Sequence, residues 1–440
     1  MNIDKKLLQQ FSAGSNENLN KAVKQSIQHN GLDRTSFNIE KKRDLQFTFS
    51  EEIKTQKITS QERSGRCWIF AGLNLIRDRI AKDNNLKDFE LSQAYTFFYD
   101  KLEKANYFLE NIIRTLDEDI YSRIVMWLLK DPVQDGGQWE MFTNLIEKYG
   151  VVPKYIMPET FHSRNSSVMN NILTAKLRDY ARIMRNMQQK GKLISELRDT
   201  KEKQLKEFYD LLCIFLGTPP KKFNFELRTN DSELISDIDL TPIEFSKKYN
   251  KVDLENYVSL INAPTPDKPY HNTYTVDFLG NVIEGKPVKY LNIEIDILKK
   301  ATIAQIKDNK PVWFGCDVRL QTERKEGLMD TDIFLYEDAL NTDISLDKSE
   351  RLLYGESFLT HAMVFTGVHL DGENSVRWKV ENSWGEDRGD KGFYLMSDKW
   401  FDEYNYQVVV HKDYLTKELK NELDKEPVVL PPWDPMGSLA

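Results

Sequence analysis

Hydrophobic residues recur at helical spacing through much of the first half of the chain and alternate with polar residues in its last third. Between Cys67 and about Ala81 they cover so much of the circumference that the pattern predicts a buried helix. Ser92 can cap a second helix that runs toward Tyr107. A further helix is expected to follow the turn at residues 135–139 and to end near residue 149.

Residues 169–218 are charged and helical, with two apolar stripes that predict two packed helices. The stripes are Leu173, Leu177, Tyr180, Ile183 and Met187, followed by Leu205, Phe208 and Leu212. Stripes at this spacing are typical of helix packing rather than of cofactor contact. We interpret the segment as a helical insertion that ends near the Gly-Thr-Pro-Pro run at 217–220.

Strand patterns dominate beyond residue 260. Alternation over 274–278 predicts a strand, a helix is expected over 293–306, and the apolar run 311–318 predicts a buried strand. Further strands are predicted at 361–370, 376–382, 391–396 and 406–411. Helices first and an antiparallel sheet afterwards indicate an α+β architecture with a site between two halves.

The first 60 residues give mixed signals. Residues 4–11 favour a short amphipathic helix or an arm, and the alternation over 45–50 favours a strand. We expect this segment to be a packed extension that carries no chemistry.

A polar turn at residues 61–66 runs directly into the first buried helix, with Cys67 at the junction. The first N–H groups of a helix have no intrahelical partner and carry the positive end of its dipole. A thiol at this position is therefore biased toward the thiolate, the nucleophilic form. The Gln61 side chain can offer an N–H to an oxygen near the Cys67 backbone N–H, and two such donors form an oxyanion hole.

The chain contains six histidines, of which only His361 lies in a suggestive motif. His361 stands at the polar start of one strand pattern, and Asn-Ser-Trp-Gly at 382–385 follows the next. Each feature has a plainer explanation, because a cysteine or histidine can be a core residue and Asn-Ser-Trp-Gly can be a turn. Together with Gln61 and Cys67, they predict a nucleophilic site.

These motifs resemble the papain-like cysteine peptidases, and Ser-Gly-Arg-Cys-Trp at 64–68 resembles the bleomycin hydrolase / aminopeptidase C branch in particular. The resemblance extends through residues 91–98, 135–139 and 312–315 and so covers most of the chain. Cys67 and His361 are far apart in the sequence, and the helical insertion and the loops at 219–290 and 319–355 account for this distance. The same expansion is characteristic of the branch that the motifs resemble.

The resemblance implies the roles of the site residues. Cys67 would be the nucleophile, His361 would take the thiol proton and later protonate the leaving amine, and Asn382 would orient the imidazole. Gln61 would complete the oxyanion hole. Trp68 and Trp384 would support the site, Trp384 by covering the hydrogen bond between His361 and Asn382.

Two further substrate contacts are implied by the resemblance. Gly136 and Gly137 would lie along the extended substrate backbone, with Gly137 pairing to it. The proline-rich segment 427–440 contains Trp433 among its large apolar side chains, so an arm lying in the cleft is expected rather than a free tail. The carboxylate of Ala440 would meet the free α-ammonium of the substrate and restrict cleavage to N-terminal residues. Ser438 departs from the Gly-Ala-Leu-Ala ending associated with the family.

The expected fold is therefore α+β, a papain-like cysteine peptidase fold with a helical half, an antiparallel β half, a helical insertion and a C-terminal arm. The expected division is an N-terminal extension at 1–60, the helical half at 61–168, the insertion at 169–260, the β-rich half at 261–412 and the arm at 413–440.

Composition and net charge limit the classes of partner that the chain is expected to bind. The net charge of −8 argues against nucleic acid or an anionic membrane as the main partner, and no apolar run is long enough to span a membrane. Three widely spaced cysteines indicate neither a disulfide framework nor a metal site, so no metal or cofactor is expected and the chain is interpreted as cytoplasmic. The resemblance implies short peptides as substrates and a homohexamer.

Two alternatives remain open at this point. An endopeptidase on the same scaffold would cleave N-blocked peptides, which an aminopeptidase would not. A catalytically silent binding protein is disfavoured because Gln61, Cys67, His361 and Asn382 are all present. A metal-dependent aminopeptidase is disfavoured because no His, Asp and Glu residues have ligand spacing.

Overall fold

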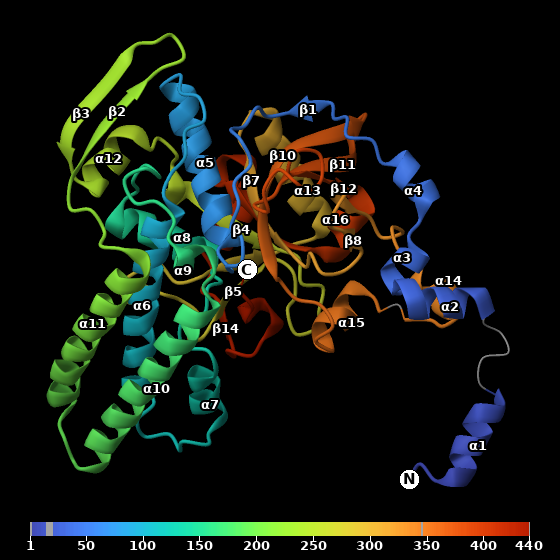
Figure 1. Cartoon of the computed structure of the whole chain (residues 1–440), viewed down its shortest axis with the longest axis horizontal. Helices are drawn as coiled ribbons and strands as arrows, with labels where there is room; N and C mark the ends of the chain where they lie inside the picture. Colours follow the sequence, from blue (N-terminus) through green and yellow to red (C-terminus); the bar gives the residue numbers. More distant parts are fainter. Residues whose placement is uncertain (1, 15–20, 345, 440) are drawn as a thin grey trace.

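A helical half and a sheet half lie side by side in the computed structural model, which describes residues 2–14, 21–344 and 346–439 (Figure 1). The helical half lies on the left of the view and the sheet half on the right, with α5 (Cys67–Asp83) between them. The C-terminal segment runs back to this junction. The α+β architecture expected from the sequence is confirmed.

The helical half is built around α5, which contacts helices on one side and the sheet on the other. Its remaining helices are α6 (Gln93–Arg114), α7 (Arg123–Lys130), α8 (Trp139–Tyr149), α9 (Phe161–Arg164), α10 (Ser167–Gln189), α11 (Ile194–Leu216) and α12 (Pro242–Tyr249). Apolar residues line α5 almost all round, and most of them are fully buried. The Ser92 side chain accepts a hydrogen bond from the Tyr95 N–H, which confirms the predicted cap of α6.

One large sheet forms the other half. Among the described residues it has 12 strands, in the order β14–β5–β6–β4–β13–β7–β10–β11–β12–β9–β8 with β1 beside β10. These strands are β1 (Glu51–Glu52), β4 (Tyr257–Ile261), β5 (Asn272–Val276), β6 (Tyr290–Asn292), β7 (Val312–Cys316), β8 (Thr322–Glu323), β9 (Leu328–Met329), β10 (His361–Asp371), β11 (Asn374–Glu381), β12 (Phe393–Ser397), β13 (Asn405–His411) and β14 (Val428–Leu430). Only the pairs β14–β5, β4–β6 and β12–β9 are parallel in this described sheet.

Short helices cover the sheet and its connections. They are α13 (Ile295–Lys307), α14 (Tyr336–Leu340), α15 (Lys348–Leu353), α16 (Asp398–Tyr404) and α17 (Lys417–Leu423), with 3₁₀ turns η1 (Leu254–Asn256), η2 (Lys412–Tyr414) and η3 (Pro435–Gly437). The chain starts with α1 (Lys5–Gly14), α2 (Lys21–Asn30), α3 (Leu32–Ser36) and α4 (Ile39–Asp44). Figure 1 shows α1 apart from the rest of the molecule.

The strand predicted over 45–50 is wrong, because ladder pairing begins only at Glu51 and Glu52. The apolar side chains of this stretch, Leu45, Phe47 and Phe49, pack against a small cluster that contains Ile333 and Phe334. The alternation of apolar and polar residues here corresponds to a half-buried segment and not to a hydrogen-bonded strand. Residues 219–250 also hold a hairpin, β2 (Phe223–Arg228) and β3 (Leu234–Leu240), where the sequence pattern predicts only a loop.

Candidate active site

Cys67 lies at the first position of α5, where the helix N-terminus meets the sheet half. Arg66 precedes the helix, and its carbonyl accepts the first helical hydrogen bond from the Phe70 N–H at 3.0 Å. The indole Nε1 of Trp313 on β7 donates to the Trp68 carbonyl at 3.4 Å. Cys67 is therefore held against the sheet by the residue that follows it.

His361 and Asn382 come together because their strands are neighbours. His361 begins β10, and Asn382 directly follows β11, which pairs antiparallel with β10. His361 Nε2 lies 2.9 Å from Asn382 Oδ1, which also accepts the Ser383 N–H at 2.7 Å. The Trp384 ring packs over the imidazole, with 4.7 Å between ring centroids. Because the hydrogen bond to Asn382 uses Nε2, the other ring nitrogen of His361, Nδ1, takes no part in it.

Cys67 and His361 are both buried, and burial dominates their protonation. Burial raises the pKa of the Cys67 thiol to about 11, although N–H groups of Ala362, Trp68 and Cys67 lower it. Burial lowers the pKa of His361 to about 4, while the hydrogen bond to Asn382 raises it and the charge of Arg324 lowers it further. Burial thus opposes the thiolate that the helix N-terminus favours. The Ala362 contact places the Cys67 sulfur beside the residue that follows His361.

Gln61 is held by hydrogen bonds at both ends of its amide. Its Nε2 donates to the Ser64 carbonyl at 2.6 Å, and its Oε1 accepts the Ser383 hydroxyl at 2.6 Å. The Gln61 backbone N–H donates to the Ser383 carbonyl at 2.9 Å. Because Nε2 carries two hydrogens, one N–H remains for a substrate oxygen.

Arg66 stabilises the turn before Cys67 through a buried ion pair that sequence reasoning did not find. Its guanidinium makes two bonds to Glu159, at 3.0 and 2.9 Å. Its Nε donates to the Ser64 hydroxyl at 2.8 Å, and that hydroxyl donates to the Gln61 carbonyl at 2.7 Å. A paired guanidinium fork is a rigid support, so it fixes the shape of the Gln61 turn.

Asp135 is a second support that the sequence shows only as a turn residue. Its carboxylate accepts the Gly65 N–H at 3.0 Å and the Lys101 ammonium at 2.7 Å. Burial raises the pKa of Asp135, but the neighbouring positive charge and hydrogen bonds, above all those of Lys101, outweigh it and hold this pKa well below its usual range. The Asp135 carbonyl accepts the Trp68 indole N–H at 2.7 Å. Asp135 therefore connects the turn before Cys67 to the Gly136–Gly137 turn.

Gly137 packs directly under Trp68. A Cβ at Gly137 would lie 2.5 Å from the Trp68 ring, so no larger residue fits without displacing it. Gly136 lies in the same turn, where its carbonyl accepts the Lys104 ammonium at 2.6 Å. These contacts explain why glycine stands at 137, and the role of both glycines in substrate binding stays a prediction.

The C-terminal segment docks beside this turn. β14 pairs with β5, and Asp434 forms an ion pair with the buried Lys268 at 2.8 Å. Gln138 Nε2 donates to the Ser438 carbonyl at 2.7 Å. The segment therefore reaches the residue next to Gly137. Ala440, expected to contact substrate, lies outside the described residues.

Two kinds of feature are absent from the described parts of the chain. No group of three or more His, Cys, Asp or Glu side chains there could hold a metal ion. No described helix is both long and apolar enough to cross a membrane. Cys67, Cys213 and Cys316 are free thiols.

The buried imidazole predicts an acid-sensitive stability. Burial lowers the pKa of His361 from 6.5 to about 4, so between these values the unfolded chain takes up a proton that the folded chain does not. We expect His361 to reduce the free energy of unfolding by about 3 kcal/mol as the pH falls from 7 to 4. Thermal unfolding of wild type and His361→Gln across this range should show the larger loss in wild type.

His271→Gln provides a control of opposite sign. A hydrogen bond donated by His271 to the Glu422 carboxylate raises the pKa of His271, so this residue stabilises the fold at low pH and loses that effect as the pH rises through its folded pKa. The His271→Gln variant should therefore be less stable than wild type mainly at low pH. Equal pH profiles for wild type and His361→Gln would contradict the assignment of a neutral buried His361.

Comparison with known proteins shows the family of the chain. A sequence model of the peptidase C1-like family matches residues 2–437. The chain belongs to this family. It is a cysteine peptidase, and its papain-like α+β fold is the one predicted from the sequence. The roles of the buried Cys67, His361 and Asn382 in this peptidase stay predictions, which the hydrogen bond between His361 and Asn382 and the contact between Cys67 and Ala362 support.

The relatives are similar over nearly their whole length. The chain is 53% identical over 437 residues to a protein named aminopeptidase C from Listeria innocua, covering 98% of each chain. It is 45% identical over 418 residues to aminopeptidase C from Lactobacillus delbrueckii subsp. lactis, covering 94% of this chain and 93% of that one. The solved structure of PepW from Lactobacillus rhamnosis HN001 superposes with a TM-score of 0.97 at 48% identity, covering 100% of this chain and 99% of the other.

Proposed function

We propose that this cysteine peptidase is a cytoplasmic aminopeptidase that removes N-terminal residues from short peptides. Relatives named aminopeptidase C support the activity. The observation that carries the exopeptidase assignment is the hydrogen bond between Gln138 and the Ser438 carbonyl. It brings the C-terminal segment to the turn that adjoins Trp68 and Cys67, where a longer N-terminal extension of a substrate would have to pass.

Cys67 attacks the carbonyl carbon of the peptide bond after its proton passes to His361. The thiolate and imidazolium then have opposite charges, and their attraction offsets the burial that keeps each group neutral by itself. Asn382 accepts the Nε2–H of His361 and fixes the ring, and Trp384 covers this contact. The ring thereby keeps the orientation needed to exchange protons with the nucleophile and the leaving amine.

The negative charge that develops on the carbonyl oxygen is stabilised by two donors. One is the Cys67 backbone N–H at the start of α5, which has no partner within the helix. The other is the remaining N–H of Gln61, whose amide is oriented by Ser64 and Ser383. His361 donates a proton to the leaving amine, and water then hydrolyses the acyl-enzyme by the same route.

The C-terminal arm limits the length of substrate on the acyl side. Met436 is buried, and its carbonyl accepts the Tyr290 hydroxyl at 3.2 Å, so the arm is anchored before it reaches Gln138. Ser438 and Leu439 then occupy space beside the Gly136–Gly137 turn. The contact of Ala440 with the substrate ammonium, and a homohexameric assembly, are the parts of the proposal that rest on family resemblance alone.

A pair of matched substrates tests the proposal. Reduced, chelator-treated enzyme is given a fluorogenic aminoacyl amide and its N-acetylated twin, and kcat/KM is measured for each. We expect cleavage of the free-amine substrate and at least about 100-fold slower cleavage of the acetylated one, because an acetyl group removes the ammonium charge and extends toward the arm. Comparable rates for both substrates would favour the endopeptidase alternative.

A further inference from the structure

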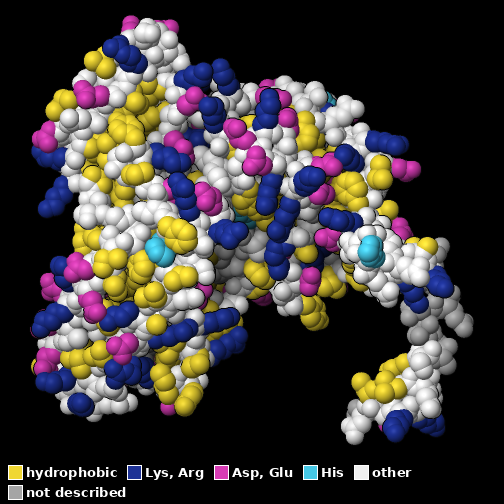
Figure 2. Space-filling view, viewed as in Figure 1, with side chains coloured by type: hydrophobic (Ala, Val, Ile, Leu, Met, Phe, Trp, Pro, Cys, Tyr) yellow, Lys and Arg dark blue, Asp and Glu magenta, His cyan; other side chains and the backbone are white. Residues whose placement is uncertain are grey.

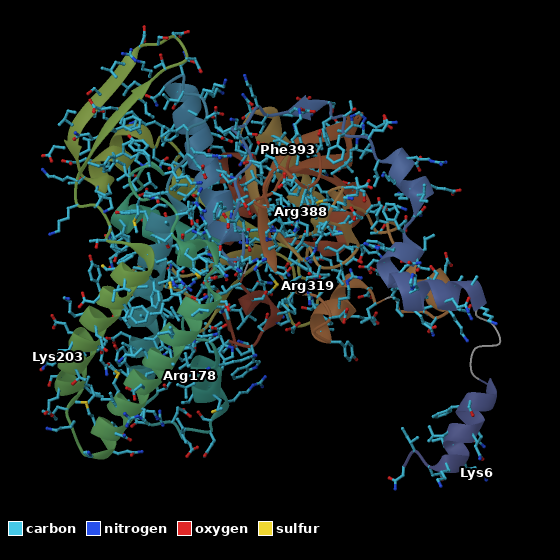
Figure 3. All side chains as sticks on the ribbon, viewed as in Figure 1. Lys6, Arg178, Lys203, Arg319, Arg388 and Phe393 are labelled. Atoms are coloured by element: carbon cyan, nitrogen blue, oxygen red, sulfur yellow. The ribbon has the colours of Figure 1, made fainter. Side chains whose placement is uncertain are left out.

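A cationic cavity opens beside the Trp384 ring. It has a volume of about 700 Å³, and its lining includes the guanidinium-bearing residues Arg63, Arg164, Arg324 and Arg388. Figure 2 shows Lys and Arg side chains gathered beside the hollow between the two halves. Figure 3, in the same view, labels Arg388 in this region. A concentration of positive charge in a hollow is notable in a chain whose net charge is −8.

The charges of this cavity are largely unneutralised. Glu62 is the one carboxylate in the lining, and it lies 3.6 Å from Arg164. Within the described parts of the chain, Arg63, Arg324 and Arg388 form no ion pair with a protein carboxylate. Arg324 and Arg388 instead each lie over the Trp384 ring, 5.5 Å from its centroid. Their charges are therefore free to bind an anion from outside the chain.

The cavity adjoins the residues proposed to serve the leaving group. Trp384 forms part of its lining and also packs on His361, the proton donor to the leaving amine. Ser60 and Glu62, which flank Gln61, line it as well, whereas no described residue of the C-terminal arm does. The part of a substrate that follows the cleaved bond is therefore directed toward the arginines.

We propose that the Arg63, Arg164, Arg324 and Arg388 cavity binds a carboxylate on the leaving portion of the substrate. Two parts of a peptide supply this chemistry: an acidic side chain just after the cleaved bond, and the free C-terminal carboxylate of a di- or tripeptide. Guanidinium groups bind carboxylates through paired hydrogen bonds, and an aromatic floor leaves these hydrogen bonds available. The inference rests on the proposed function and adds a substrate class to it.

The electrostatics of His361 agree with this assignment. The positive charge of Arg324 contributes to the lowered pKa of His361, so the two groups are close enough to interact. A carboxylate bound at Arg324 would offset that charge. A substrate bearing the carboxylate thus favours the protonated imidazole that must donate to the leaving amine.

Three tripeptide substrates test the inference: trialanine amide, alanyl-glutamyl-alanine amide and trialanine with a free C-terminus. The first has no carboxylate, the second has one on its side chain, and the third has one at its end. We expect kcat/KM to be about tenfold higher for at least one of the carboxylate substrates than for trialanine amide, since charge-assisted bonds to arginine are strong. The substrate that gains identifies the source of the carboxylate.

Arg324→Gln and Arg388→Gln measure the contribution of the cavity. Both side chains are exposed, so the substitutions remove charge without leaving a buried cavity. Each is expected to lower the ratio of carboxylate to amide kcat/KM by about fivefold. Lys203→Gln removes one positive charge from the exposed face of α11, far from Arg388 in Figure 3, and should leave the ratio at its wild-type value.

The outcomes separate this inference from the function it rests on. A wild-type ratio near one, or Arg variants that slow all three substrates equally, would overturn the carboxylate site while free-amine cleavage still supports an aminopeptidase. Failure of wild type to cleave any of the three unblocked tripeptides would instead remove the aminopeptidase assignment, and the cavity proposal with it.

Discussion

Replacing Cys67 by alanine is expected to lower kcat by roughly 10⁴-fold or more, because removal of a covalent nucleophile leaves only binding and the oxyanion donors. The loss should appear with the free-amine substrate under reducing, metal-free conditions. Cys67 is buried at the start of α5, and its sulfur contacts the Ala362 N–H. Alanine removes the sulfur and little volume, so circular dichroism and the thermal midpoint should remain near those of wild type.

Cys213→Ala is the matched control for a general thiol effect. Cys213 lies half-buried on α11 in the helical half, on a different helix from Cys67. Its replacement should leave kcat within about twofold of wild type. Retention of more than a tenth of wild-type turnover by Cys67→Ala would show that another group attacks the substrate.

Removing residues 438–440 is expected to convert the exopeptidase into an enzyme that also cleaves blocked peptides. The deletion keeps β14, the buried Met436 and the ion pair between Asp434 and Lys268, but it removes the contact at Gln138. We expect kcat/KM for the free-amine substrate to fall by about 10- to 100-fold, because the charge-assisted contact proposed between the Ala440 carboxylate and the substrate ammonium is lost. The acetylated substrate should gain by about tenfold or more as the cleft opens.

Ser438→Ala controls for disturbance of the arm. The Ser438 hydroxyl donates to the Pro435 carbonyl at 2.8 Å, while the bond to Gln138 uses the Ser438 backbone, which alanine retains. This variant should keep the wild-type preference for the free amine. If the truncated enzyme still rejects acetylated substrates as strongly as wild type does, the arm is not the element that excludes them.

The three residues proposed for the nucleophilic chemistry could be singled out in the sequence because each stands at the end of a periodic element. Cys67 begins the buried helix, His361 begins β10, and Asn382 follows β11, and these positions are visible in the hydrophobic pattern. The hydrogen bond between His361 and Asn382 then follows from antiparallel pairing of neighbouring strands. The supports could not be found this way, because Glu159 and Asp135 meet Arg66 and Gly65 only after folding.

The failures of the sequence pattern have physical causes. Alternation over 45–50 predicts which side chains face the protein, but pairing needs a free strand edge, which only Glu51 and Glu52 reach on β10. The β2–β3 hairpin buries Phe223 and Phe225 on β2, but β3 has no fully buried residue and exposes Leu234 and Ile238, so the alternation marks only one of its two strands. Position at a helix N-terminus favours a thiolate at Cys67, whereas the surrounding fold buries the sulfur and raises its pKa.

The most direct test of the mechanism is the mass of the enzyme trapped during turnover. A tetrapeptide ester is mixed with wild type, quenched in acid within milliseconds, and analysed by intact mass and peptide mapping. The account predicts an adduct of one aminoacyl residue on Cys67, because nucleophilic attack occurs one residue from the free amine. An adduct of two or more residues, or one on any other side chain, would contradict it.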